Sequence, residues 1–236
     1  MSVTTVFLDL YHTLAHFYPP REQRAASALA GLGFQVPLVD LQRAYLVADV
    51  YYTQANQERP LNLMAPEEKA RVYVRFHEIL LKEVGLGHVV QLAPQFQQGY
   101  SDIEREFQLF PDVEPALARL KSEGYRLGLI TNIDSDPAEY LGQTGLNGYL
   151  DLVVASCLVG FDKPDPRIFH YALDAAGAAA NEAVHVGDLL CSDVAGAQAA
   201  GIKAVLLDRY DLQVGLHPYR ITSLDQLPAL LRDGLS

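Results

Sequence analysis

Short apolar runs that alternate with helical patterns are the feature of this sequence that most restricts its fold. Such runs are typical of strands that are covered on both faces of a parallel sheet. They lie at Val3–Leu8, Tyr125–Thr131, Leu150–Ser156, Ala183–Gly187 and Ile202–Leu207. Helical patterns lie between the later runs, at Asp112–Glu123, Pro137–Gln143 and Pro166–Ala176. This alternation predicts a doubly wound α/β domain with a parallel sheet and right-handed crossovers.

Capping residues set the expected bounds of two of these helices. Asp165 precedes Pro166, and Gly177 follows the last helical residue. A capping side chain, a proline in the first turn and a glycine after the last turn are the usual order at helix ends. Asp136 stands before Pro137 in the same way. We therefore expect both aspartates to cap helices.

The segment from residue 14 to residue 109 has a different pattern. No β-branched run interrupts it, and its apolar residues return at helical spacing. Breaks at residues 31–33, 59–60 and 85–87 divide it into about four helices. We therefore predict a helical domain at residues 14–109, inserted after the first strand of an α/β domain that consists of residues 1–13 and 110–236.

Composition and charge narrow the class of partner. Half of the 236 residues are hydrophobic, and the formal net charge is −11. Such a chain can bury a sizeable core, but it lacks the clustered cations with which proteins bind nucleic acid or anionic membranes. Cys157 and Cys191 have no disulfide-framework or zinc-site spacing, and residues 1–8 lack a basic leader region. We therefore expect a cytoplasmic protein with a small-molecule partner.

Polar residues directly follow several of the predicted strands. Because parallel strands end at one edge of a sheet, ligands bind beyond their carboxyl ends. The residues expected at this edge are Asp9, Tyr11, His12, Thr13, Thr131, Asn132, Asp162, Lys163, Asp165, Asp188 and Asp193. Each of them alone also fits an ordinary turn or helix cap. Their occurrence together, at the ends of successive strands, predicts a functional site.

These segments resemble the four motifs of the haloacid dehalogenase-like (HAD) hydrolases. Residues 9–14 read DLYHTL and residues 129–132 read LITN. The more specific third and fourth motifs correspond to VGFDKPDPRIF at residues 159–169 and HVGDLLCSDVAGA at residues 185–197. The resemblance is closest to the branch named for a rhythmically expressed gene product. It implies a Rossmann-like core with an α-helical cap at residues 14–109.

The resemblance implies catalytic and substrate-binding roles for the polar residues. Asp9 would be the nucleophile that forms a covalent aspartyl intermediate, which water then hydrolyses. Lys163 would neutralise both Asp9 and an anionic substrate. Thr131, with the amide of Asn132, would hold the transferring group, and Thr13 is expected to contact the substrate as well.

The resemblance also implies a magnesium site. Asp9, Asp188 and the backbone carbonyl of Tyr11 would bind Mg²⁺ through hard oxygen ligands. Asp193 would orient a metal-bound water or Lys163. Three carboxylates against one lysine leave local negative charge that a divalent cation would balance.

Tyr11 departs from the usual phosphatase motif, which has a second aspartate there as general acid. Losing such a group costs about 10²- to 10⁴-fold in rate if nothing replaces it. Tyrosine at this position is similar to the 2-haloacid dehalogenases, whose halide leaves without a proton. His12 is an alternative acid or base, although it lies one position after the residue at which the phosphatases carry the aspartate. Arg43 either reaches the substrate from the cap or lies on a solvated helix face.

Three functions remain open at this point. The first is a Mg²⁺-dependent phosphatase that acts on a small phosphorylated metabolite through an aspartyl-phosphate intermediate. An acyl or aryl phosphate, whose leaving group needs no acid, would reconcile Tyr11 with Asp188. The second is a 2-haloacid dehalogenase-type hydrolase. The third is a non-catalytic HAD-like protein that binds metal or phosphate.

Overall fold

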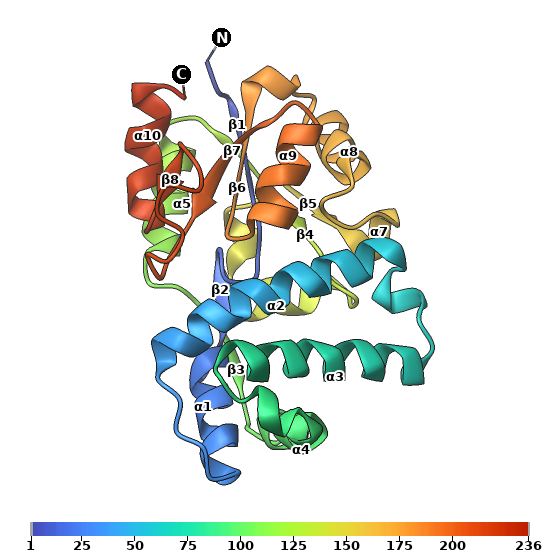
Figure 1. Ribbon diagram of the computed structural model, residues 1–236. Helices are drawn as coiled ribbons and strands as arrows, with labels where there is room; N and C mark the ends of the chain where they lie inside the picture. The colour runs from blue at the N-terminus through green and yellow to red at the C-terminus, as the bar shows by residue number, and fades with distance from the viewer. Residues whose placement is uncertain (1, 236) are drawn as a thin grey trace. The chain divides into compact units, whose positions relative to one another are not determined.

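The computed structural model describes residues 2–235 and divides into two compact units (Figure 1). The α/β unit contains the chain up to His16 and from Phe107 onward, and the helical unit contains Phe17–Glu106. The insert thus begins at residue 17 rather than 14 and ends at residue 106 rather than 109. Among the described residues, no helix has both the length and the apolar composition of a membrane span.

The described chain of the α/β unit forms a six-stranded sheet in the order β5-β4-β1-β6-β7-β8, and all neighbouring strands are parallel. The strands are β1 Thr5–Leu8, β4 Arg126–Thr131, β5 Leu152–Ala155, β6 Ala183–Gly187, β7 Lys203–Leu207 and β8 Arg220–Ile221. After β5 the chain crosses to the other side of β1, which is the strand-order reversal of a doubly wound sheet. The predicted α/β fold is confirmed, and β8 is an addition to it.

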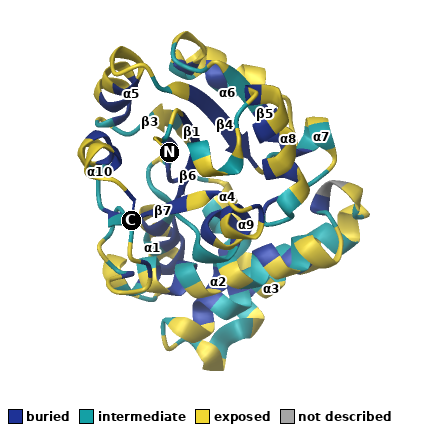
Figure 2. Ribbon diagram, turned by 90° about the horizontal axis from the view of Figure 1, so that it is seen from above, coloured by how far each residue is buried: buried dark blue, intermediate teal, exposed yellow. Residues whose placement is uncertain are grey.

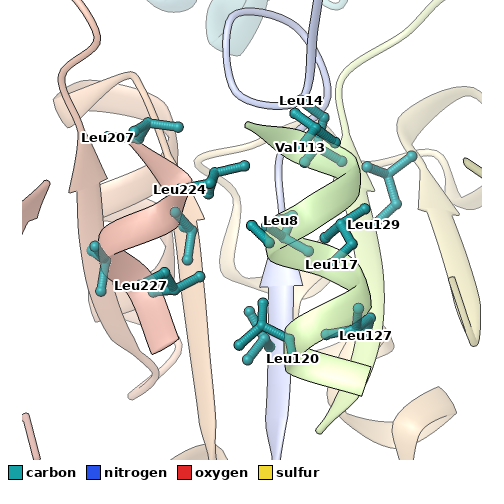
Figure 3. Packing of buried hydrophobic residues seen from close by; sticks show 14 of the residues in the cluster. Leu8, Leu14, Val113, Leu117, Leu120, Leu127, Leu129, Leu207, Leu224 and Leu227 are labelled. Carbon is teal, nitrogen blue, oxygen red and sulfur yellow. The ribbon is translucent and has the colours of Figure 1, made fainter. Parts of the chain in front are cut away.

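Helices cover this sheet on both faces because alternate residues of a strand point to opposite sides. Val6 and Leu8 of β1 pack in one hydrophobic cluster, and Phe7 packs in another. Figure 3 shows the first cluster, in which Leu8 lies near Leu117 and Leu120 of the green helix and near Leu127 and Leu129 of the neighbouring strand β4. In Figure 2 strand β4 is buried between layers whose outer faces are exposed. The helices are α5 Val113–Ser122, α6 Pro137–Thr144, α7 Ser156–Val159, α8 Pro166–Ala176, α9 Ala195–Ala199 and α10 Leu227–Asp233.

Both predicted N-caps are confirmed. Asp165 Oδ1 accepts a hydrogen bond from the Arg167 amide at 2.9 Å at the start of α8. Asp136 Oδ1 accepts from the Ala138 amide at 2.9 Å at the start of α6. Gly177 ends α8 at φ +61°, a left-handed conformation that glycine adopts without a steric penalty.

Short irregular helical turns complete the described chain. A π-helical turn, Leu190–Val194, leads from β6 into α9. The 3₁₀ turns are Leu61–Leu63, Gly87–Leu92, Leu146–Gly148, Ala180–Glu182 and Leu224–Gln226. The π turn lies within the fourth motif and carries Asp193, so its geometry bears directly on the candidate site.

The helical unit has its own core. Its α-helices are α1 Arg21–Gly31, α2 Leu38–Glu58, α3 Pro66–Glu83 and α4 Ala93–Ser101. Leu29, Leu41, Tyr45, Leu80 and Phe96 are among the buried residues that pack together in it. The first three helices end at the glycine and proline breaks seen in the sequence.

The expectation of helix throughout residues 14–109 is wrong at both ends. Strands β2, Ala15–Tyr18, and β3, Glu106–Leu109, pair as a two-stranded sheet where the chain enters and leaves the insert. Each strand has four residues, so neither shows a pattern long enough to recognise in the sequence. Their pairing depends on the meeting of two segments that are far apart in the chain.

Candidate active site

The site is built on β1, the strand that pairs with both β4 and β6. Leu8 lies opposite Leu129 of β4 and Val186 of β6. The next residue, Asp9, continues this path, because its amide donates to the Val186 carbonyl at 2.9 Å. Asp188 follows the last residue of β6. Parallel pairing therefore brings the first and fourth motifs to the same edge of the sheet, as predicted.

Lys163 lies in a loop that the second motif holds in place. The Asn132 side chain accepts a hydrogen bond from the Lys163 amide at 2.7 Å and donates to the Lys163 carbonyl at 2.9 Å. Both polar ends of the asparagine side chain are thus used on the lysine backbone. This positioning role was not foreseen, since the sequence assigned only the Asn132 amide, as a substrate ligand.

A buried ion-pair network joins three of the predicted residues. Lys163 Nζ lies 2.5 Å from Asp9 Oδ1 and 2.7 Å from Asp193 Oδ1. Lys163 is 3% exposed and Asp193 is 1% exposed. The second oxygen of Asp193 accepts from the Leu189 amide at 3.1 Å. The lysine therefore bridges the nucleophile candidate and an aspartate whose orientation is itself fixed.

His185 is a member of this network that the sequence analysis missed. Its Nε2 lies 2.9 Å from Asp193 Oδ1, and the residue is fully buried in the middle of β6. The available signal was a single polar residue within an apolar strand, AVHVG. That signal is weak because it also fits a histidine that serves only packing.

Burial and charge shift the ionisation of these groups. Burial raises the pKa of Asp9 to about 6, although the nearby Lys163 acts in the opposite direction. Burial also acts to raise the pKa of Asp193, but Lys163 and His185 outweigh it and hold that pKa below its usual range. The pKa of Lys163 is raised, because the two aspartates outweigh the effect of its burial. Lys163 therefore remains charged near neutral pH.

The carboxylates suit a divalent cation. Asp9, Asp188 and Asp193 each offer an oxygen, and these oxygens lie within 4.8 Å of one another. Carboxylate oxygens are the ligands that Mg²⁺ prefers. Both oxygens of Asp193 already accept hydrogen bonds. Asp9 and Asp188 are consequently the better candidates for direct ligands, with Asp193 in the supporting role that the sequence also allowed.

The loop after β1 holds the remaining residues of the first motif. His12 has a positive φ of 65°, and its ring lies 4.2 Å from the Tyr11 ring, measured between centroids. The Thr13 side chain is fully buried, and its hydroxyl makes no hydrogen bond within residues 2–235. Thr131, at the end of β4, is 2% exposed. Thr13 and Thr131 are thus both buried, and their contacts with the substrate, like the role of Tyr11, stay predictions.

Arg209 supports this loop from the segment after β7. Its Nη2 donates to the Thr13 carbonyl at 2.6 Å, and its Nη1 pairs with Asp112 Oδ2 at 3.0 Å. Its guanidinium also lies 3.8 Å from the centroid of the Phe110 ring. In the helical unit, by contrast, the Arg43 side chain is 66% exposed and 3.9 Å from Asp40, as expected of a solvated helix face.

Gly187 allows the end of β6 to lie directly against Asp193 of the ion-pair network. A Cβ at this position would lie 2.2 Å from Asp193 Cγ and 2.5 Å from Asp193 Cβ. No side chain fits at these distances, so glycine is needed for the close approach of β6 to the π turn.

Known proteins with sequences similar to this chain are phosphatases in several instances. It is 39% identical over 133 residues to a phosphoserine phosphatase of Thermus thermophilus, covering 56% of this chain and 51% of that protein. It is 29% identical over 218 residues to a ribulose-1,5-bisphosphate 5-phosphatase of Halopiger xanaduensis, covering 87% and 84%. The chain spans about half the length of the first curated relatives that it matches.

Solved structures of both chemical types share the fold. A 2-haloacid dehalogenase from Pseudomonas syringae pv. Tomato is 28% identical, with a TM-score of 0.56, and 98% of this chain and 99% of that one are covered. A HAD phosphatase from Thermococcus onnurineus is 25% identical, with a TM-score of 0.57 and 98% of both chains covered. The model of the haloacid dehalogenase-like hydrolases matches residues 3–201. Since this match includes all four motifs that build the site, the chain belongs to the haloacid dehalogenase-like hydrolase family.

Proposed function

We propose that this hydrolase is a Mg²⁺-dependent phosphatase that acts on a small, anionic phosphorylated metabolite. The observation that carries the proposal is the convergence of the Asp9, Asp188 and Asp193 carboxylates within 4.8 Å, together with the 2.5 Å contact between Lys163 and Asp9. A metal-independent dehalogenase has no use for the carboxylate of Asp188. The named phosphatase relatives support the same choice.

In the proposed phosphoryl transfer, Asp9 is the nucleophile and Lys163 supplies the balancing positive charge. Asp9 attacks phosphorus, so that an aspartyl–phosphorus bond forms while the bond to the leaving oxygen breaks. Lys163 balances the charge of Asp9 and of the transferring group, in the position that Asn132 sets. Water then hydrolyses the acyl phosphate, which releases phosphate and restores Asp9. Mg²⁺ held by Asp9, Asp188 and the Tyr11 carbonyl would stabilise the negative charge of the phosphoryl group.

Tyr11 sets the expected leaving group. A phenol is a much weaker proton donor than a carboxylic acid, and its neutral form is a poor base. Substrates whose leaving group departs without a proton, such as aryl and acyl phosphates, therefore suit the site better than alkyl phosphates. We expect turnover of an aryl phosphate to exceed that of an alkyl phosphate by about 10²- to 10⁴-fold, the usual contribution of a general acid.

A 2-haloacid dehalogenase is the second candidate. The observation in its favour is Tyr11, together with the likeness to a solved 2-haloacid dehalogenase over 98% of this chain. In that reaction Asp9 attacks carbon and the halide leaves with its electron pair, so neither an acid nor a metal is needed. It predicts chloride release from 2-chloropropionate in the presence of a chelator.

One panel separates these functions. Phosphate release from an aryl and an alkyl phosphate, and chloride release from 2-chloropropionate, are measured with Mg²⁺ and with a chelator. The proposal expects phosphate release that stops with the chelator and in Asp9→Asn. Asp174→Asn, a substitution of an exposed aspartate on α8, serves as the matched control and should retain activity. Metal-independent chloride release would favour the second candidate, and phosphate release that persists in Asp9→Asn would exclude this mechanism.

A further inference from the structure

We propose that His185 is a positioning residue that fixes Asp193 and, through it, the Lys163 ammonium against Asp9. The contact on which this rests is the 2.9 Å approach of His185 Nε2 to Asp193 Oδ1 inside the fully buried part of the site. The inference rests on the proposed function for its effect on rate, but the arrangement itself can be tested without turnover.

The backbone of His185 is held from both sides. Strand β6 lies between β1 and β7, and His185 is in register with Phe7 of β1 and Ala204 of β7. Its ring is 0% exposed and packs edge-on against Phe169 of α8, with centroids 5.1 Å apart and an interplanar angle of 85°. The ring therefore has little freedom to turn away from Asp193, because rotation would drive it into packed side chains.

Hydrogen-bond chemistry selects one tautomer of this ring. An ionised carboxylate oxygen only accepts hydrogen bonds, so Nε2 at 2.9 Å from it must carry the proton. The other nitrogen, Nδ1, is buried and makes no hydrogen bond to any residue from 2 to 235. A bare Nδ1 fits a neutral ring with its single proton on Nε2. The imidazole thus presents one donor, and that donor faces Asp193.

Asp193 needs this donor because its first oxygen is shared. Oδ1 accepts from both Lys163 Nζ at 2.7 Å and His185 Nε2, while Oδ2 accepts from the Leu189 amide at 3.1 Å. Three donors from three segments leave the carboxylate one orientation. Without His185, Oδ1 faces the flexible lysine alone, and the ammonium is free to move toward Asp193 and away from Asp9. The loss should fall on the chemical step, since Lys163 acts on the nucleophile.

The test compares a variant that removes the donor with one that keeps it. His185→Phe keeps a flat ring but has no donor, whereas His185→Gln places an amide nitrogen near the position of Nε2. We expect kcat for an aryl phosphate to fall about 10- to 100-fold in His185→Phe, with KM little changed. This is the usual loss when a residue that orients the groups of a metal site is removed. His185→Gln should recover most of the loss. His170→Phe, at an exposed histidine on α8, is the matched control.

A second measurement reads the tautomer directly. In long-range ¹H–¹⁵N spectra of the full chain, the histidine signal that is lost in His185→Gln belongs to His185. This signal should show the proton on Nε2, and it should shift in Asp193→Asn. Equal kcat in His185→Phe and wild type, a proton on Nδ1, or a signal indifferent to Asp193→Asn would each overturn the inference. If the wild type releases no phosphate, the proposed function fails, while the spectra still decide whether His185 holds Asp193.

Discussion

Gly187→Ala is the substitution whose effect follows most directly from the packing of the site. The added methyl carbon would lie 2.2 Å from Asp193 Cγ, whereas carbon atoms in contact prefer about 3.5–4.0 Å. Relief therefore requires Asp193 to move by about 1 Å or more. Because Asp193 Cβ is also only 2.5 Å away, rotation of the carboxylate alone does not remove the clash. The π turn that carries Asp193 must shift.

Two costs follow from this shift. Overpacking a well-packed interior costs about 1–3 kcal/mol. A movement of 1 Å also breaks the 2.7 Å contact between Asp193 and the buried Lys163, and breaking a buried ion pair costs about 3–5 kcal/mol. Since the backbone relaxes in part, we expect the free energy of unfolding of the α/β unit to fall by about 3–5 kcal/mol. At roughly 2–4 °C per kcal/mol, its melting temperature should fall by about 6–20 °C.

Urea and thermal unfolding followed by far-UV circular dichroism measure this loss, and the chain has no tryptophan for a fluorescence assay. Gly142→Ala is the matched control, because a Cβ on this helical glycine meets no atom within 4 Å. That change should be neutral or stabilise by up to about 1 kcal/mol. A Gly187→Ala protein that unfolds at the same urea concentration as wild type, with kcat intact, would show that the close approach is not required.

Two further predictions concern the loop after β1 and the helical unit. Arg209→Met removes the donor to the Thr13 carbonyl, so kcat/KM should fall about 10-fold, comparable to the loss of one charged hydrogen bond; unchanged kinetics would refute the role. Burial lowers the pKa of His77 from its ordinary 6.5 to about 4. The folded protein therefore binds a proton at His77 less readily than the unfolded chain does, and the free energy of unfolding should fall as the pH falls from 6.5 toward 4. At pH 4.5 the loss is about 2.5 kcal/mol by linkage, and urea unfolding of His77→Phe should lack this acid-dependent loss.

The parts of the fold that were predicted from sequence have local causes. Strand β6 and helix α8 have their expected bounds, Ala183–Gly187 and Pro166–Ala176, because buried-strand composition and capping residues act within a few positions. The two-residue strand β8 was not predicted, since it exists only through its pairing with Leu206 and Leu207 of β7. Strands β2 and β3 were missed for the same reason.

The residues of the candidate site also fall into those that the sequence predicted and those that it did not. The polar residues at strand ends were recognisable because a parallel sheet brings them to one edge, and Asp9, Asp188 and Asp193 do converge. The supporting contacts were not recognisable. Asn132 acts on the backbone of Lys163, and His185 acts on Asp193 across a turn, so both roles depend on distances between segments that spacing along the chain does not determine.

The pair of Lys163 and Asp9 has a consequence for the order in which the chain acquires its chemistry. The two residues are 154 positions apart, and Asp193 is synthesised later still. Both partners of Asp9 therefore follow the whole insert in the chain, and Asp9 has neither of them until the insert has been made. The ion-pair network requires both the Lys163 loop and the segment after β6, which pairs with β1, to be in place. Ligands of the centre should accordingly stabilise the completed sheet, because they bind a state that the unfinished chain is unable to form.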